Sequence, residues 1–117
     1  MEAHISIEVE QARFLRCIGE PTRLQILKLL AESEKCVGEI TEALAKEQSL
    51  VSHHLRALKE CNIVVVRQEA QRIYYNLADP RLSELVVTTE SLIKELPLCQ
   101  SKGVCYDKQE DQECCES

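Results

Sequence analysis

The stretch that decides the fold is residues 47–77, which read EQSLVSHHLRALKECNIVVVRQEAQRIYYNL. Its first half places Val51, Leu55 and Leu58 at positions i, i+4 and i+7, which is one face of a helix ending near Cys61. After Asn62 the pattern changes to two β-branched or alternating runs joined by a short polar connection, which is typical of a hairpin. The stretch therefore predicts a helix followed by two strands, at residues 63–67 and 72–77.

Apolar residues at helical spacing lie on both sides of this stretch. Pro21 suits the first position of a helix, where its missing N–H costs no hydrogen bond, and Pro97 ends the last helical pattern. Two short helices with a tight connection, followed by a hairpin, describe a winged helix-turn-helix. We therefore predict a mainly α fold with a small β-hairpin, whose further helices cover residues 7–18, 21–31, 37–46 and 79–96.

Length and composition predict one globular domain. The chain has 117 residues, of which 44% are hydrophobic and 29% charged, and no apolar run approaches the roughly 18 residues of a membrane span. Residues 1–4 contain neither a basic leader nor an apolar segment, so we expect a cytoplasmic protein. We expect a DNA-binding and dimerisation domain over residues 1–97 and a cysteine-rich acidic tail over residues 98–117.

The distribution of charge favours nucleic-acid binding despite a net charge of −6. Basic residues outnumber acidic ones between Lys46 and Arg72, whereas the tail is acidic. In a winged helix the N-terminal part of the recognition helix enters the major groove. We therefore assign base edges or phosphates to Gln48, Ser49, Ser52 and His53, and phosphates to Arg56, Lys59, Arg67 and Arg72. His54 is expected to be a satisfied packing or capping histidine.

Three segments resemble successive signatures of the ArsR/SmtB metalloregulators. They are residues 19–27 (GEPTRLQIL), 51–58 (VSHHLRAL) and 72–79 (RIYYNLAD), in the order and at the spacing of that family. The resemblance covers roughly residues 10–95. It implies a homodimer built on the first and last helices, which binds an imperfect palindrome in operator DNA. It also implies a repressor that leaves DNA when it captures its inducer.

The chain departs from the family pattern at two places. Members of the family often open the recognition helix with Ser-Gln, whereas Glu47-Gln48 stands here, and a carboxylate at that position can still cap the helix. Their wings often turn through Glu-Gly-Arg, whereas residues 69–72 read EAQR. Because alanine at a positive φ is costly, we expect a different turn at the wing tip.

Two inducer sites of the family are incomplete in this chain. The Cys-Val-Cys motif of a common thiolate site is Cys36-Val37-Gly38 here, so only one thiol remains. A zinc-type site pairs Asp-x-His with His-x-x-Glu, but the corresponding segments are residues 79–81 (DPR) and 92–95 (LIKE), which lack both histidines. Neither site is predicted.

The remaining cysteines predict an inducer site of another composition. In a reducing compartment, seven cysteines indicate metal or redox chemistry rather than a disulfide framework. Cys99 and Cys105 flank a short flexible loop, and soft thiolates select As(III), Cd, Pb, Zn or Cu(I) over hard cations. As the resemblance suggests, the third thiolate would come from the partner subunit's Cys61, or else from Cys114 or Cys115. Cys17, Cys36 and Cys61 can each also be ordinary buried cysteines.

Three other functions remain open at this point. Cys99 and Cys105 can form a disulfide in a redox- or sulfide-sensing repressor, or the acidic chain can be a metallochaperone-like protein that uses its winged helix only to dimerise. An enzyme is the least favoured class because the sequence has no Gly-rich phosphate loop, no Ser-His-Asp order and no paired-carboxylate motif. We therefore predict a repressor with no organic cofactor and no membrane partner.

Overall fold

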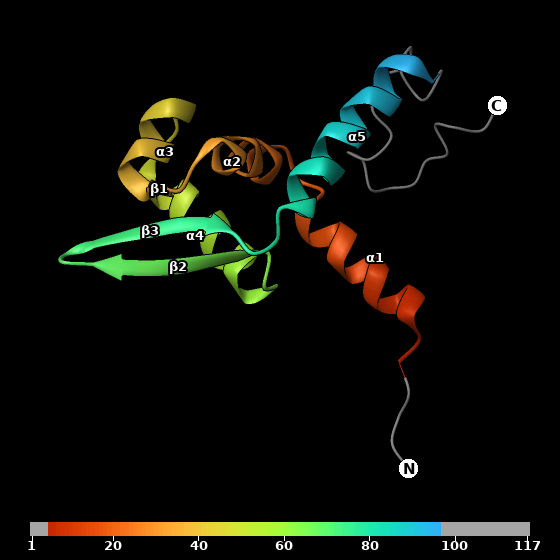
Figure 1. The fold of residues 1–117 in the computed structure, drawn as a ribbon, viewed down its shortest axis with the longest axis horizontal. Coiled ribbons are helices and arrows are strands. Elements are labelled where there is room, and N and C mark those ends of the chain that lie inside the picture. Colours follow the sequence, from red (N-terminus) through yellow and green to blue (C-terminus); the bar gives the residue numbers. More distant parts are fainter. Residues whose placement is uncertain (1–4, 97–117) are drawn as a thin grey trace. The chain divides into compact units, whose positions relative to one another are not determined.

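A computed structural model describes residues 5–96 of the chain (Figure 1). The predicted succession of helices and a hairpin is confirmed, and with it the mainly α winged helix-turn-helix class. None of the described helices is long and apolar enough to cross a membrane. The elements are α1 (Ile7–Ile18), α2 (Pro21–Glu32), β1 (Lys35–Cys36), α3 (Val37–Leu44), α4 (Gln48–Glu60), β2 (Val64–Glu69), β3 (Arg72–Leu77) and α5 (Arg81–Glu95).

Internal contacts divide the chain after Val86 into two units, Met1–Val86 and Val87–Ser117. Of the second unit the structure describes only residues 87–96, which include the C-terminal part of α5. The predicted boundary between residues 97 and 98 and the cysteines of the tail lie outside the described residues. Their arrangement stays a prediction.

Side chains next to the first two helices satisfy N–H groups that have no partner within the helix. The Ser6 hydroxyl accepts a hydrogen bond from the Val9 N–H at 3.2 Å, which caps α1. The Glu20 carboxylate accepts from the Arg23 N–H at 2.9 Å, and Pro21 occupies the first turn of α2 as predicted. The sequence GEPTR therefore separates α1 from α2 and starts the second helix.

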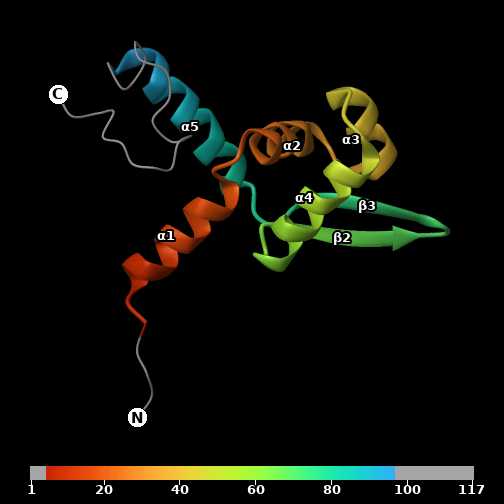
Figure 2. The ribbon, with the colours of Figure 1, turned by 180° about the vertical axis from the view of Figure 1, so that it is seen from behind.

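The sheet is antiparallel, with strand order β1-β3-β2. The hairpin pairs Val64 with Leu77 at its base and Glu69 with Arg72 at its tip, and Figures 1 and 2 both show it reaching beyond the helices. The third strand, β1, was not predicted. It has only two residues, so no alternation of apolar and polar side chains is available to indicate it.

The turn at the wing tip corrects one expectation. Two residues, Ala70 and Gln71, connect the strands, and Ala70 has φ 58°. The expectation that alanine would avoid the left-handed region here was therefore wrong. The strand register holds Ala70 in a conformation that costs a non-glycine residue about 1–2 kcal/mol.

The core of the first unit lies where α2, α3 and α4 meet the beginning of the hairpin. On α2 the most deeply buried residue is Ile26, whereas Leu24 is only half-buried. The predicted face of α4 is confirmed, since Val51, Leu55 and Leu58 are buried. The other buried hydrophobic residues are Cys17, Ile18, Leu27, Leu30, Ile40, Ile63, Val64, Leu82 and Val86.

Two helices keep exposed apolar side chains that the described core does not cover. On α1 these are Ile7, Val9 and Leu15, which are 50–65% exposed. In the second unit, Val87 is 63% exposed, and Leu92, Ile93 and Leu96 are exposed as well. On α5 only Leu82 and Val86 are buried, so several apolar side chains of this helix remain on its surface.

Candidate nucleic-acid interface and cysteine sites

Helix α4 presents its predicted DNA-reading residues on the face opposite the core. Gln48, Ser49 and His53 are exposed near its N-terminus, and Ser52 is half-buried. Farther along the helix, the cations predicted to contact phosphate, Arg56 and Lys59, are both exposed. The helix therefore carries polar groups in its first turns and positive charge toward its end, which is the order that groove reading followed by backbone contact requires.

The N-terminus of α4 differs in one detail from a capped helix. Glu47 occupies the N-cap position, but its side chain makes no capping hydrogen bond. The N–H groups of the first turn thus have no side-chain acceptor from Glu47, and such groups are ready donors to a phosphate oxygen. The connection from α3 is tight because Ala45 ends that helix in the left-handed conformation, with φ 56°.

His54 anchors α4 to α2 rather than facing DNA. Its side chain is buried, and its Nδ1 accepts a hydrogen bond from Arg23 Nε at 2.9 Å. The Nε2 lies 3.8 Å from the Glu20 carboxylate. Burial lowers the pKa of His54, while Glu20 opposes that effect. The expectation of a satisfied packing histidine is confirmed. Sequence reasoning did not identify Arg23 as its partner, although His54 neighbours the buried stripe.

The guanidinium of Arg67 interacts with residues of the hairpin and of the loop before β1. It forms ion pairs with Glu34 and with Glu69, the latter at 2.6 Å, and it lies 4.8 Å from the centre of the Tyr74 ring. These contacts tie the hairpin to the loop before β1. A phosphate contact by Arg67 would therefore compete with two carboxylates for the same guanidinium. Arg72, at the first position of β3, is exposed. Phosphate contact by either residue stays a prediction.

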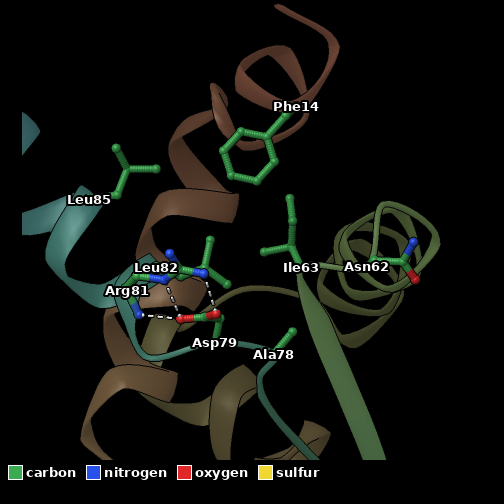
Figure 3. A pocket seen from close by; sticks show the side chains of 8 residues that line it. All are labelled: Phe14, Asn62, Ile63, Ala78, Asp79, Arg81, Leu82 and Leu85. Carbon is green, nitrogen blue, oxygen red and sulfur yellow. Dashed lines mark hydrogen bonds and ion pairs between the residues drawn. The ribbon is translucent and has the colours of Figure 1, made fainter. Parts of the chain in front are cut away.

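A cavity of about 390 Å³ lies where α5 begins, lined by Phe14, Leu82 and Leu85 among others (Figure 3). The Asp79 carboxylate at its edge accepts hydrogen bonds from the Arg81 N–H at 2.8 Å and from the Arg81 guanidinium at 2.9 Å. These bonds lower the pKa of Asp79 to about 2. Arg81 thus stands where the zinc-type motif has a histidine, and it engages the carboxylate that remains from the Asp-x-His half of that motif.

The three cysteines in the described part of the chain differ in exposure. Cys17 is buried at 8% exposure, Cys36 is half-buried at the N-cap of α3, and Cys61 is exposed at the C-cap of α4. The interpretation as an ordinary buried cysteine is therefore confirmed for Cys17 and wrong for Cys61. Within residues 5–96, no group of three or more His, Cys, Asp or Glu side chains is arranged to hold a metal ion.

Comparison with known proteins identifies the family. A family model described as bacterial regulatory protein, arsR family, matches residues 20–66. An uncharacterized HTH-type transcriptional regulator of Methanocaldococcus jannaschii is 42% identical over 82 residues, which are 69% of this chain and 92% of that protein. A probable mercury resistance operon repressor of Streptomyces lividans is 35% identical over 81 residues, which are 69% of this chain and 65% of that repressor.

Solved structures agree with the observed architecture. The homodimeric winged helix-turn-helix DNA-binding domain of a possible ArsR-family regulator from Mycobacterium bovis matches with a TM-score of 0.70 and 29% identity. The match covers 83% of this chain and 94% of that one. The family model covers α2 to the first half of β2, the segment that holds the exposed face of α4 and the Arg23–His54 contact. This chain belongs to the ArsR/SmtB family of DNA-binding winged helix-turn-helix transcriptional repressors.

Proposed function

We propose that this repressor leaves its operator when cysteine thiolates bind a thiophilic metal or metalloid, with As(III) as the first candidate. The observation that carries the proposal is the position of Cys61. Its thiol is exposed and stands at the C-cap of α4, the helix whose exposed face is assigned to DNA. A ligand held by Cys61 is therefore attached directly to the reading element.

The remaining ligands are proposed to be Cys99 and Cys105. Trigonal capture of As(III) needs three sulfurs, and residues 5–96 contain no three-ligand group of His, Cys, Asp and Glu side chains. The thiols of the tail are proposed as the sulfur ligands that complete the site, because residues 5–96 alone offer no group of three. Thiolates select soft ions over hard ones. The resemblance favours the partner subunit's Cys61 as the third ligand, with Cys114 or Cys115 as the other choices. A relative named for mercury resistance supports a thiophilic inducer, whether As(III), Cd, Pb or Zn.

The DNA-bound form is proposed to be a homodimer on an imperfect palindrome. Exposed apolar residues on α1 and on the C-terminal part of α5 offer the surface that a second copy can cover. A dimer presents two α4 helices, which matches the two half-sites of a palindrome. The Mycobacterium bovis domain, which is homodimeric, supports this assembly.

Serine substitution at Cys99 or Cys105 tests the thiolate site. Each variant should keep the operator affinity of the wild type, because neither side chain is assigned to DNA, and should lose release by arsenite or cadmium. Operator binding is measured by fluorescence anisotropy under reductant, with Cys36→Ser as the matched control that still responds. If both tail variants release the operator normally on arsenite addition, the site does not include these thiols. Release by diamide but not by arsenite would instead support the redox-sensing alternative.

A further inference from the structure

Two cysteines far apart in the sequence converge on one backbone oxygen. The Cys17 thiol, near the end of α1, donates a hydrogen bond to the Ala57 carbonyl with Sγ and O 3.8 Å apart. The Cys61 N–H donates to the same carbonyl at 3.1 Å. The last turns of α1 and α4 are thus held together where these two cysteines stand, within the first unit of the chain.

The Cys61 thiol lies close enough to affect the titration of Cys17. Burial is the largest cause, and the Cys61 thiol the next, of the raised pKa of Cys17, which is about 11. Cys17 is buried, whereas Cys61 is exposed. One sulfur therefore lies inside the domain and the other is accessible from solvent, so that an ion can be captured first by Cys61 and then shared with Cys17.

A cation stands beside this pair. The Arg23 guanidinium donates to the Cys17 carbonyl at 2.9 Å and lies 3.8 Å from the Cys17 sulfur, measured from Nη1. Arg23 is held in place by its second hydrogen bond, from Nε to His54. A single negative charge that developed at the two sulfurs would therefore be compensated by a fixed positive charge.

We propose that Cys17 and Cys61 form a two-coordinate site for a monovalent thiophilic cation, of which Cu(I) is the probe. Two sulfurs and no third His, Cys, Asp or Glu ligand among the described residues suit an ion that accepts linear bis-thiolate ligation. Each thiol gives its proton to solvent on binding. The complex of one monovalent cation with two thiolates carries a charge of −1, which Arg23 balances.

Other chemistries fit this pair less well. Structural Zn(II) sites take four ligands, and As(III) needs three sulfurs. A disulfide requires the sulfurs to approach to about 2 Å, with a restricted dihedral angle, whereas an ion between them keeps them apart. Hg(II) also accepts two thiolates, but its complex is neutral and gains nothing from the positive charge of Arg23.

This site needs none of the tail thiols, although it uses Cys61, which is also a ligand in the proposed inducer site. The test therefore uses the full chain with serine at positions 36, 99, 105, 114 and 115, so that Cys17 and Cys61 are its only cysteines. This protein is titrated anaerobically with Cu(I) against a colorimetric Cu(I) chelator, and in parallel with Zn(II). The outcome does not depend on whether Cys99 and Cys105 bind an inducer.

We expect one Cu(I) per chain, protection of Cys61 from alkylation, and no comparable uptake of Zn(II). Adding Cys61→Ser or Cys17→Ser should abolish this binding, while circular dichroism verifies the fold. Arg23→Gln should weaken Cu(I) binding by about 10–100-fold, as for other residues that support metal ligands, and should affect Hg(II) less.

Three results would overturn the proposal: no Cu(I) binding, equal binding in the Cys61→Ser variant, or an intact mass showing a Cys17–Cys61 disulfide in place of the complex. The alkylation measurement keeps the test decisive if Cys17→Ser fails to fold, since Cu(I) must still protect Cys61 in the parent protein.

Discussion

His54 belongs to α4, the helix assigned to DNA, but its side chain is buried in the core. Arg23 Nε donates to its Nδ1 at 2.9 Å, so that nitrogen carries no proton and the imidazole is neutral when this bond is formed. Protonation of the buried ring would place a second positive charge beside Arg23. Burial is the main cause of its lowered pKa. The folded state therefore binds a proton at His54 less readily than the unfolded chain does.

This difference predicts a pH dependence of stability. The unfolded histidine titrates near 6.5 and the folded one below it, so the unfolded state binds more protons as the pH falls through this range. The contribution of His54 to the free energy of unfolding should be constant above about pH 6.5 and should decrease below it. Urea unfolding at a series of pH values from neutral to mildly acid measures the effect.

Two variants separate His54 from other titrating groups. His54→Gln should flatten the dependence just below neutral pH, whereas His53→Gln, at an exposed position of the same helix, should keep it. The Asp79 carboxylate, whose pKa is about 2, titrates far below this range. An unchanged slope in the His54 variant would show that this histidine is not the group involved.

At the scale of elements, periodicity predicted most of the fold. The core face of α4, the two strands of the hairpin and the limits of α1 were all indicated by the spacing of apolar residues. Periodicity did not indicate β1, which is too short, or the left-handed Ala70, which the strand pairing imposes. Contacts between distant residues, such as Arg23 with His54 and Cys17 with Ala57, have no signature in a single sequence.

The candidate site was predicted less completely than the fold. The exposed residues of α4 follow from the same helical spacing that buries Val51 and Leu55, so their face could be predicted. The ion pairs of Arg67 with Glu34 and Glu69 could not, because they depend on where the loop before β1 packs against the wing. The sequence also did not determine whether Cys61 is buried, and the structure shows that it is exposed.

Helix α4 allows base reading and phosphate contact to be separated by mutation. Replacing Arg56 or Lys59 by alanine should weaken binding to all DNA sequences alike and lower the salt slope by about one for each phosphate that the variant no longer neutralises. Replacing Gln48 or Ser52 by alanine should weaken binding to the operator more than to random DNA, because their polar groups stand at the N-terminal end of the helix.

These binding constants are measured by anisotropy over a range of salt concentrations. Glu60→Ala, an exposed residue at the end of the same helix, is the matched control and should not reduce affinity. Identical behaviour of the two groups of variants would show that the division of α4 into base-reading and phosphate-contacting parts is wrong.

At the scale of the whole molecule, the exposed apolar residues of α1 and α5 predict a homodimer. Leu15→Glu on α1 and Val87→Glu on α5 each place a charge on a surface that a partner would cover, at side chains that are 52% and 63% exposed. Both variants should sediment as monomers at concentrations where the wild type is a dimer. Val65→Glu, on an exposed position of β2, should leave the dimer intact. A monomeric wild type at micromolar concentration would refute the assembly.

The net charge of −6 is compatible with DNA binding because the tail is acidic and the segment from Lys46 to Arg72 is not.

Regulation needs only a modest coupling between inducer and DNA, since about 1–3 kcal/mol changes operator affinity 5- to 150-fold. By linkage, DNA must weaken inducer binding by the same factor.

The most direct test of inducer-controlled repression is an anisotropy titration of the reduced wild-type protein on its own promoter fragment. Arsenite, Cd, Pb and Zn are added in turn to the preformed complex. We predict that the protein binds the fragment specifically and that at least one thiophilic ion, arsenite first, weakens this binding by about 5- to 150-fold. Binding that none of the four ions alters would contradict the proposal that this ArsR/SmtB-family repressor is controlled through its thiols.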